Sequence, residues 1–124
     1  MANITFRYAT KNDSELVLKF IKELAVYEKL ENEVVATKEL LEKWIFDENK
    51  AEVIFAVVSG KEVGFALFFS TFSTFLGRPG IHLEDLYVSP EYRGLGYGRA
   101  ILKKLSQITV QRDYGRLESL RSRS

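Results

Sequence analysis

The sequence predicts an α+β domain, with a mixed, mostly antiparallel sheet flanked by helices. Three apolar runs rich in β-branched and aromatic residues, at 52–59, 62–71 and 81–88, are typical of strands. Two segments with helical periodicity precede them, and a cluster of glycines leads from the last run into another amphipathic segment. The 124 residues suit one domain.

The N-terminal part predicts one strand and two helices. Ile4 to Tyr8 alternates between apolar and polar residues, which indicates a short strand. A helix follows from Glu15 to about Leu30, with N-cap candidates at residues 12–14. Thr37 can cap a second helix, whose inward-facing side chains are expected to be Leu40, Leu41, Trp44 and Ile45.

The C-terminal part predicts a hairpin, a third long strand and a helix. Ser59-Gly60-Lys61 is a turn signal between the first two strands, and a loop is expected over residues 73–80. Ser89-Pro90 ends the strand at 81–88. The last helix is expected from about Gly98 to Tyr114, with Gly115 as its C′ residue.

Composition excludes several classes of protein. The net charge of +1 gives no reason to expect a nucleic-acid partner. Without cysteine there are no disulfides or thiolate metal sites, and we expect a cytoplasmic protein without a bound metal. No apolar run reaches the ~18 residues of a membrane span, so no membrane partner is expected.

The glycines at 94, 96 and 98 stand between a strand and a helix, where bare backbone amides and the helix N-terminus can bind phosphate. Their spacing does not fit the dinucleotide fingerprint, and Arg99 stands where a P-loop requires a second glycine. Arg93 to Gly98 fits the R-x-x-G-x-G loop that holds the pyrophosphate of coenzyme A. The alternative is a turn that uses glycine for its conformation alone.

A longer pattern, HLEDLYVSPEYRGLGYGRAILKKLSQ, together with RYATKNDSELVLKFIKELAVYEK and EVGFALFF, carries a family resemblance. The chain resembles the GNAT (Gcn5-related) N-acetyltransferases, and within them the diamine (spermidine/spermine) branch. The resemblance runs from about Ile4 to about Tyr114. It implies transfer of acetyl from acetyl-CoA to a primary amine of a small molecule, a diamine, polyamine or amino-acid-like amine, by direct attack in a ternary complex.

The resemblance also implies roles for particular residues. Glu84 would be the general base, and Tyr27 and Glu28 would help to form the amine pocket with it. Leu86, Tyr87 and Val88 would offer backbone groups to the pantetheine arm. The pyrophosphate would be wrapped by residues 93–99, which are Arg93, Gly94, Leu95, Gly96, Tyr97, Gly98 and Arg99. Strand alternation predicts that Glu84 and Asp85 point to opposite faces, so that only one of them enters a given cleft.

Two departures from the family pattern change the expectation. The loop STFSTFLGRPG has no carboxylate for a second ammonium, which favours a smaller or amino-acid-like amine. The family also continues with a strand, a helix bearing the general-acid tyrosine, and closing strands, for which Tyr114 is not a substitute. We therefore expect residues 1–115 to form an incomplete GNAT domain and residues 116–124 to be a non-native or disordered tail.

The sequence leads to three further expectations. An exposed sheet edge left by the short C-terminus would favour a homodimer. The alternative function is a truncated, catalytically silent acyl-CoA-binding or dimer-forming remnant. His82, two residues before Glu84, is expected to be a partner-bonded or solvated strand residue, with a role in tuning the site as the alternative.

Overall fold

The structure is a computed structural model, and it describes residues 3–119. A five-stranded sheet has the strand order β1-β2-β3-β4-β5, antiparallel except for β4 with β5. The strands are β1 Ile4–Tyr8, β2 Glu52–Val58, β3 Lys61–Ser73, β4 Arg78–Val88 and β5 Leu117–Glu118. The helices are α1 Ser14–Tyr27, α2 Lys38–Leu41 and α3 Tyr97–Gln111, with a π-helical turn at Glu42–Asp47 and 3₁₀ turns at Lys11–Asp13, Glu31–Glu33 and Pro90–Tyr92.

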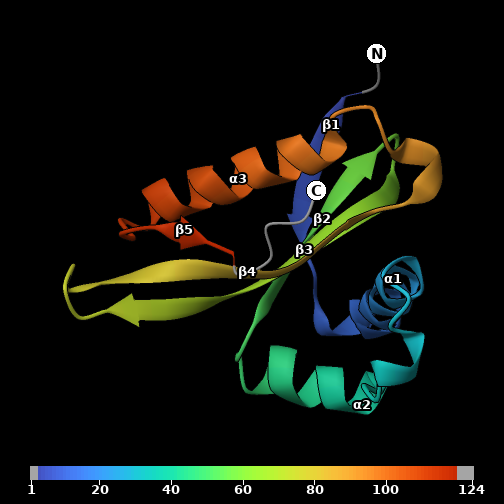
Figure 1. The fold of residues 1–124 in the computed structure, drawn as a ribbon, viewed down its shortest axis with the longest axis horizontal. Helices are drawn as coiled ribbons and strands as arrows, with labels where there is room; N and C mark the ends of the chain where they lie inside the picture. The colour runs from blue at the N-terminus through green and yellow to red at the C-terminus, as the bar shows by residue number, and fades with distance from the viewer. Residues whose placement is uncertain (1–2, 120–124) are drawn as a thin grey trace.

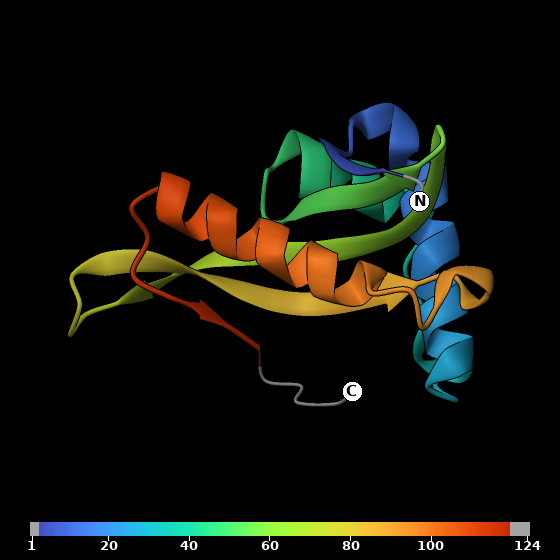
Figure 2. The same cartoon turned by 90° about the horizontal axis from the view of Figure 1, so that it is seen from above.

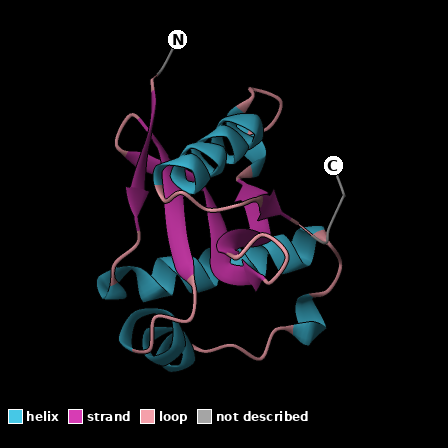
Figure 3. Ribbon diagram, turned by 90° about the vertical axis from the view of Figure 1, so that its left-hand side faces the viewer, coloured by secondary structure: helices cyan, strands magenta, loops and turns pink. Residues whose placement is uncertain are grey.

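The helices cover both faces of the sheet, so the predicted α+β architecture is confirmed. In Figures 1 and 3, α3 lies over one face, while α1 and α2 lie over the other. Each face has its own apolar core. Ile101, Leu105 and Ile108 of α3 pack on one face, and Val17, Phe20 and Leu24 of α1 on the other. Among residues 3–119, no helix has the length and apolarity to cross a bilayer.

The β3–β4 hairpin is longer than the sequence predicted. The loop expected at residues 73–80 is mostly strand, because Phe72 pairs with Pro79 and Ser73 with Arg78. The turn is confined to residues 74–77, where Gly77 takes a positive φ of 67°. The resulting arm extends beyond the rest of the sheet (Figure 2).

Both long helices end earlier than predicted. α1 ends at Tyr27 rather than Leu30, because Lys29 adopts a positive φ of 60°. α3 ends at Gln111, and Asp113 with a φ of 58° takes the left-handed position that was expected of Gly115. Aspartate tolerates this conformation better than most residues do. At Gly115, a Cβ would lie 2.9 Å from Leu76, so close packing accounts for that glycine.

Trp44 was expected to face inward, but 46% of its surface is exposed. The segment Glu42–Asp47 is π-helical, which turns its residues relative to an α-helix. Only Ile45 of this segment is buried. The prediction assumed an α-helical period and therefore assigned Trp44 to the wrong face.

Residues assigned to the tail form the fifth strand. Leu117 and Glu118 pair in parallel with Ile81 and His82 of β4. The pairing begins with the hydrogen bond of 2.9 Å that the Ile81 amide donates to the Arg116 carbonyl. Arg121 and Arg123, also assigned to the tail, lie outside the described residues.

Arg7 of β1 ties the start of α1 to the sheet. Its guanidinium donates to Asp13 at 2.9 Å and to Glu62 of β3 at 3.1 Å. The hydrogen bond from Arg7 lowers the pKa of the Asp13 carboxyl to about 2, although burial opposes the shift and the Thr10 amide supports it.

The Asp13→Asn substitution should lower the free energy of unfolding by about 1 kcal/mol at pH 7, a typical upper value for a partly exposed ion pair. A carboxyl whose pKa is depressed on folding stabilises the fold above its unfolded pKa of 3.8 and loses that effect as the pH falls through about 2. Urea unfolding at pH 7, 4 and 3 should therefore show the two proteins converging. A difference that does not change with pH would contradict the role of this pair.

Candidate active site

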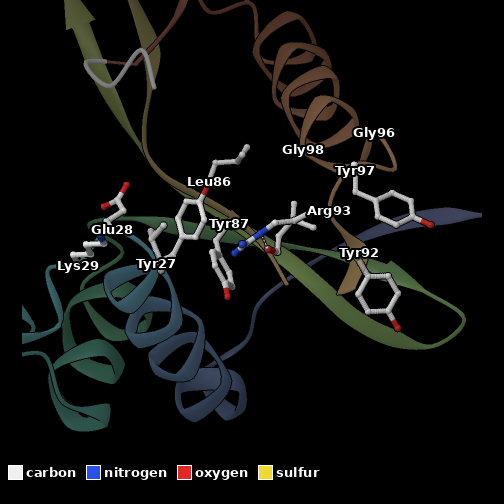
Figure 4. A pocket seen from close by; sticks show the side chains of 13 residues that line it. Tyr27, Glu28, Lys29, Leu86, Tyr87, Tyr92, Arg93, Gly96, Tyr97 and Gly98 are labelled. Atoms are coloured by element: carbon white, nitrogen blue, oxygen red, sulfur yellow. Dashed lines mark hydrogen bonds between the residues drawn. The ribbon is translucent and has the colours of Figure 1, made fainter. Parts of the chain in front are cut away.

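A cavity of about 640 Å³ opens where β4, the glycine loop and the C-terminal end of α1 meet. We call it the loop cavity, and its size falls in the range of small-molecule sites. Figure 4 shows the labelled side chains around it. Its lining comprises Leu24, Tyr27, Glu28, Lys29, Leu86, Tyr87, Val88, Tyr92, Arg93, Gly94, Gly96, Tyr97 and Gly98.

The glycine loop leaves backbone amides accessible at the start of α3. Gly94 and Gly96 have positive φ values of 77° and 86°, and a Cβ at either position would have no atom within 4 Å. Gly96 is also the N-cap of α3, so no side chain covers the first amides of that helix. Unpaired amides and the positive end of the helix dipole suit an anion such as phosphate.

Arg93 joins the loop to both β4 and α1. Its Nε donates to the Val88 carbonyl at 2.9 Å, and its guanidinium lies 4.2 Å from the ring centroid of Tyr27 and 5.2 Å from that of Tyr87. The three side chains lie together in Figure 4. The Val88 carbonyl, one of the backbone groups expected to meet pantetheine, therefore already accepts a bond from Arg93.

The Tyr87 phenol anchors the same wall to α1. Its hydroxyl donates to Glu23 at 3.2 Å, and its ring packs near Phe20 in the core beneath α1. Burial, followed by the nearby Glu23 carboxylate, raises the pKa of the Tyr87 phenol. The phenol therefore stays neutral around physiological pH and acts as a hydrogen-bond donor.

A second, acidic pocket of about 380 Å³ adjoins the loop cavity. Leu24 and Glu28 line both. The acidic pocket is formed by Ile21, Leu24, Ala25, Glu28, Leu30, Glu33, Val34, Val35, Ala36, Glu84 and Asp85. Four of these residues are carboxylates, which makes the pocket suitable for a cation.

Glu84 and Asp85 both line this pocket, so the prediction that they face different clefts is wrong. The reason is a β-bulge in β4. Asp85 pairs with Leu67 and Leu83 with Phe68, which leaves Glu84 as an extra residue opposite β3. A bulge interrupts the alternation of side chains on which the prediction rested.

The structure brings together most of the site residues predicted from sequence. Eight of the ten expected cofactor residues line the loop cavity together with Tyr27 and Glu28, whereas Leu95 and Arg99 are exposed outside its lining. Glu84 lines the acidic pocket rather than the loop cavity. Leu24, Lys29 and Tyr92 in the cavity and Glu33 in the pocket were not predicted from the sequence. Of these, Tyr92 lies inside the glycine-loop motif, and Leu24 and Lys29 lie inside the quoted N-terminal stretch, so only Glu33 had no signal of this kind.

Comparison with known proteins places this fold and loop in one family. Residues 18–123 match the family described as "Acetyltransferase (GNAT) family". The chain belongs to this family. As a GNAT protein it is an acetyl-CoA-dependent N-acetyltransferase, as the sequence motif predicted.

Sequence relatives support the assignment of this chain to the diamine-type branch of the GNAT family. The chain is 38% identical over 121 residues to a thialysine N-epsilon-acetyltransferase of Sus scrofa, covering 90% of this chain and 71% of the relative. It is 38% identical over 119 residues to the protein of the same name in Caenorhabditis elegans, covering 95% and 72%. It is also 34% identical over 112 residues to a human spermidine/spermine N(1)-acetyltransferase-like protein 1, covering 84% and 16%.

Solved structures share the GNAT fold. An aminoglycoside acetyltransferase from an uncultured soil metagenomic sample, in complex with sisomicin, superimposes with a TM-score of 0.81 at 17% identity, covering 97% of this chain and 78% of the other. A predicted acetyltransferase from Clostridium acetobutylicum, with acetyl-CoA, gives a TM-score of 0.80 at 18% identity, covering 98% and 82%. These likenesses establish the fold.

The Arg93→Met substitution should lower the free energy of unfolding by about 1–2 kcal/mol, because it removes a charge-assisted hydrogen bond and two ring contacts. Arg99→Met, which changes an exposed arginine in the first turn of α3, is the matched control and should change the free energy of unfolding by less than about 0.5 kcal/mol. Urea unfolding followed by circular dichroism measures both. Equal effects of the two substitutions would mean that Arg93 does not join the loop to α1.

Proposed function

We propose that this chain transfers the acetyl group of acetyl-CoA to a primary amine of a small molecule, by direct attack in a ternary complex. The observation that carries the proposal is that the loop cavity and the acidic pocket share Leu24 and Glu28. An anion-binding cavity and a cation-binding pocket thus adjoin. Reaction between two bound partners is accelerated when both are held next to each other.

The coenzyme would occupy the loop cavity. Its pyrophosphate would accept hydrogen bonds from the amides around Gly94, Gly96 and Gly98, which the first turn of α3 reinforces electrostatically. Arg93, Leu95, Tyr97 and Arg99 complete the proposed loop. β5 pairs only with Ile81 and His82, so within residues 3–119 no strand covers that side of β4 from Leu83 onward. The pantetheine arm would align along this stretch at Leu86, Tyr87 and Val88, as an added strand does.

Glu84 would be the general base. A primary amine is mostly protonated at neutral pH and must lose a proton before it attacks a thioester. The bulge places Glu84 in the acidic pocket, and its side chain remains 52% exposed, so that an ammonium or an intervening water has access to it. Tyr27 and Glu28 would hold the amine between the loop cavity and the acidic pocket.

The acidic pocket favours a cationic amine with further polar groups. Glu28, Glu33, Glu84 and Asp85 line it, although the β3–β4 turn contributes no carboxylate. The names of the relatives refer to thialysine, spermidine/spermine and L-ornithine. We therefore infer an amino-acid-like or diamine substrate. A homodimer and a cytoplasmic location stay predictions of the sequence.

Gly96→Ala should weaken acetyl-CoA binding at least about tenfold, because a methyl group would crowd the amides that approach the pyrophosphate. Gly60→Ala is a close control, since Gly60 also has a positive φ, of 78°, and open space around it, but lies in the β2–β3 turn. Each substitution should cost about 1–2 kcal/mol of backbone strain. Calorimetric titration with acetyl-CoA, and with adenosine 3′,5′-bisphosphate, compares them. Equal affinities in both variants would contradict the loop's role.

Glu84→Gln should lower kcat roughly 10²–10⁴-fold while acetyl-CoA affinity is retained, because the amide cannot accept the ammonium proton. Glu91→Gln, an exposed carboxylate in the 3₁₀ turn Pro90–Tyr92, is the control and should leave kcat unchanged. Release of the coenzyme A thiol in the presence of thialysine, ornithine or spermidine measures the rate. Wild-type binding of acetyl-CoA without transfer to any amine would instead support the acyl-CoA-binding remnant.

A further inference from the structure

We propose that His82 is a positioning residue that orients Glu84 and relays the proton of the amine from it, while a second carboxylate, Glu118, fixes the tautomer of the ring. The inference rests on the proposed function, in which Glu84 is the base. The Nε2 atom of His82 lies 3.5 Å from Oε1 of Glu84, and its Nδ1 lies 3.4 Å from Oε2 of Glu118. The imidazole thus stands between two carboxylates, each facing a different ring nitrogen.

The position of the ring is fixed by the fold. His82 is only 6% exposed, and its ring lies 4.9 Å from the centroid of Phe69 on β3. Parallel pairing of His82 with Glu118 holds β5 beside it. A buried polar ring normally retains hydrogen-bond partners. Here Nδ1 has Glu118 as its hydrogen-bond partner, and Nε2 lies within ion-pair distance of Glu84. The charges around the ring come from β4 and β5, because β3 contributes a neutral aromatic side chain.

Arg116 contacts the far side of Glu118 and so fixes which carboxylate oxygen faces the histidine. Its Nε lies 3.3 Å from Oε1 of Glu118, the oxygen that does not face the histidine. This contact orients the Glu118 carboxylate, with its other oxygen facing the histidine. The arrangement follows a pattern known from catalytic sites, in which a third group sets the orientation of a base. Here Arg116 orients Glu118, Glu118 orients His82, and His82 orients Glu84.

The chemistry follows from the donors and acceptors of imidazole. A neutral ring carries one N–H and one lone pair. With the proton on Nδ1 donated to Glu118, the Nε2 lone pair faces Glu84. When Glu84 takes a proton from the ammonium, that proton can move to Nε2, and Glu84 returns to the carboxylate form. The resulting imidazolium donates to both carboxylates, and it releases the proton to solvent through the half-exposed Glu84 after the amine has reacted.

A purely structural histidine would give the same packing but not the same tautomer or kinetics. His82 is the only histidine in the chain, so a tag-free sample gives a single imidazole signal. Long-range ¹H–¹⁵N spectra of the neutral ring should show the proton on Nδ1, and Glu118→Ala should move it towards Nε2. A wild-type ring protonated on Nε2, or a tautomer unaffected by Glu118→Ala, would overturn the relay whether or not the protein is active.

The kinetic test uses the full chain with acetyl-CoA and its best amine. His82→Phe keeps an aromatic ring against Phe69 but removes both nitrogens, and it should lower kcat at least about tenfold with an unchanged KM for acetyl-CoA. His82→Ala should be partly rescued by added imidazole and not by pyrazole, a ring of similar size that is a much weaker base. Circular dichroism confirms that each variant is folded.

The outcomes separate this inference from the proposed function. Wild-type transfer that is unaltered in His82→Phe overturns the relay and leaves the proposed function in place. Rescue by pyrazole as well as imidazole shows that the ring only fills space, which also overturns the relay. If the wild-type chain transfers no acetyl group to any amine, the proposed function fails and the catalytic role of His82 fails with it.

Discussion

The extra residue in β4 at Glu84 is the constraint on which the site depends. Leu83 belongs to the core beneath α3, whereas Tyr87, four residues later, belongs to the core beneath α1. In a regular strand these two side chains would share a face. The bulge at Glu84 exchanges the faces. It thereby directs Tyr87 towards α1 and places Glu84 beside Asp85 in the acidic pocket.

Both ends of α1 are bound to the sheet, and these contacts fix the position of the loop cavity relative to the acidic pocket. Arg7 joins the start of the helix to β1 and β3 through Asp13 and Glu62, and Arg93 joins its C-terminal end to β4 through the Tyr27 ring and the Val88 carbonyl. Partly exposed ion pairs contribute at most about 1 kcal/mol each. Their main effect is geometric, since α1 supplies Leu24 and Tyr27 and is followed directly by Glu28.

Features with a local sequence signature could be predicted from the sequence. Features that depend on how distant segments pack together could not. The hairpin at Gly60, the glycine loop and the stripe of α1 each follow from neighbouring residues. The bulge at Glu84 leaves only a weak pattern, because a single extra residue breaks the alternation at one point in a short strand. Lys29 and Glu33 reach the site only because the connection between α1 and α2 folds back along it. Trp44 was misplaced because a π-helical turn has a different period from an α-helix.

The central claim is that the adjoining loop cavity and acidic pocket allow the acetyl group to pass directly from acetyl-CoA to the amine. No acetyl group is then carried by the protein. A rapid-quench experiment with the protein in excess over acetyl-CoA, followed by intact-mass spectrometry, tests it most directly. The account predicts that coenzyme A thiol is released only when an amine is present, that acetylated amine appears at the same rate, and that the mass of the protein never changes. Thiol release without amine, accompanied by a gain of one acetyl group on the chain, would contradict it.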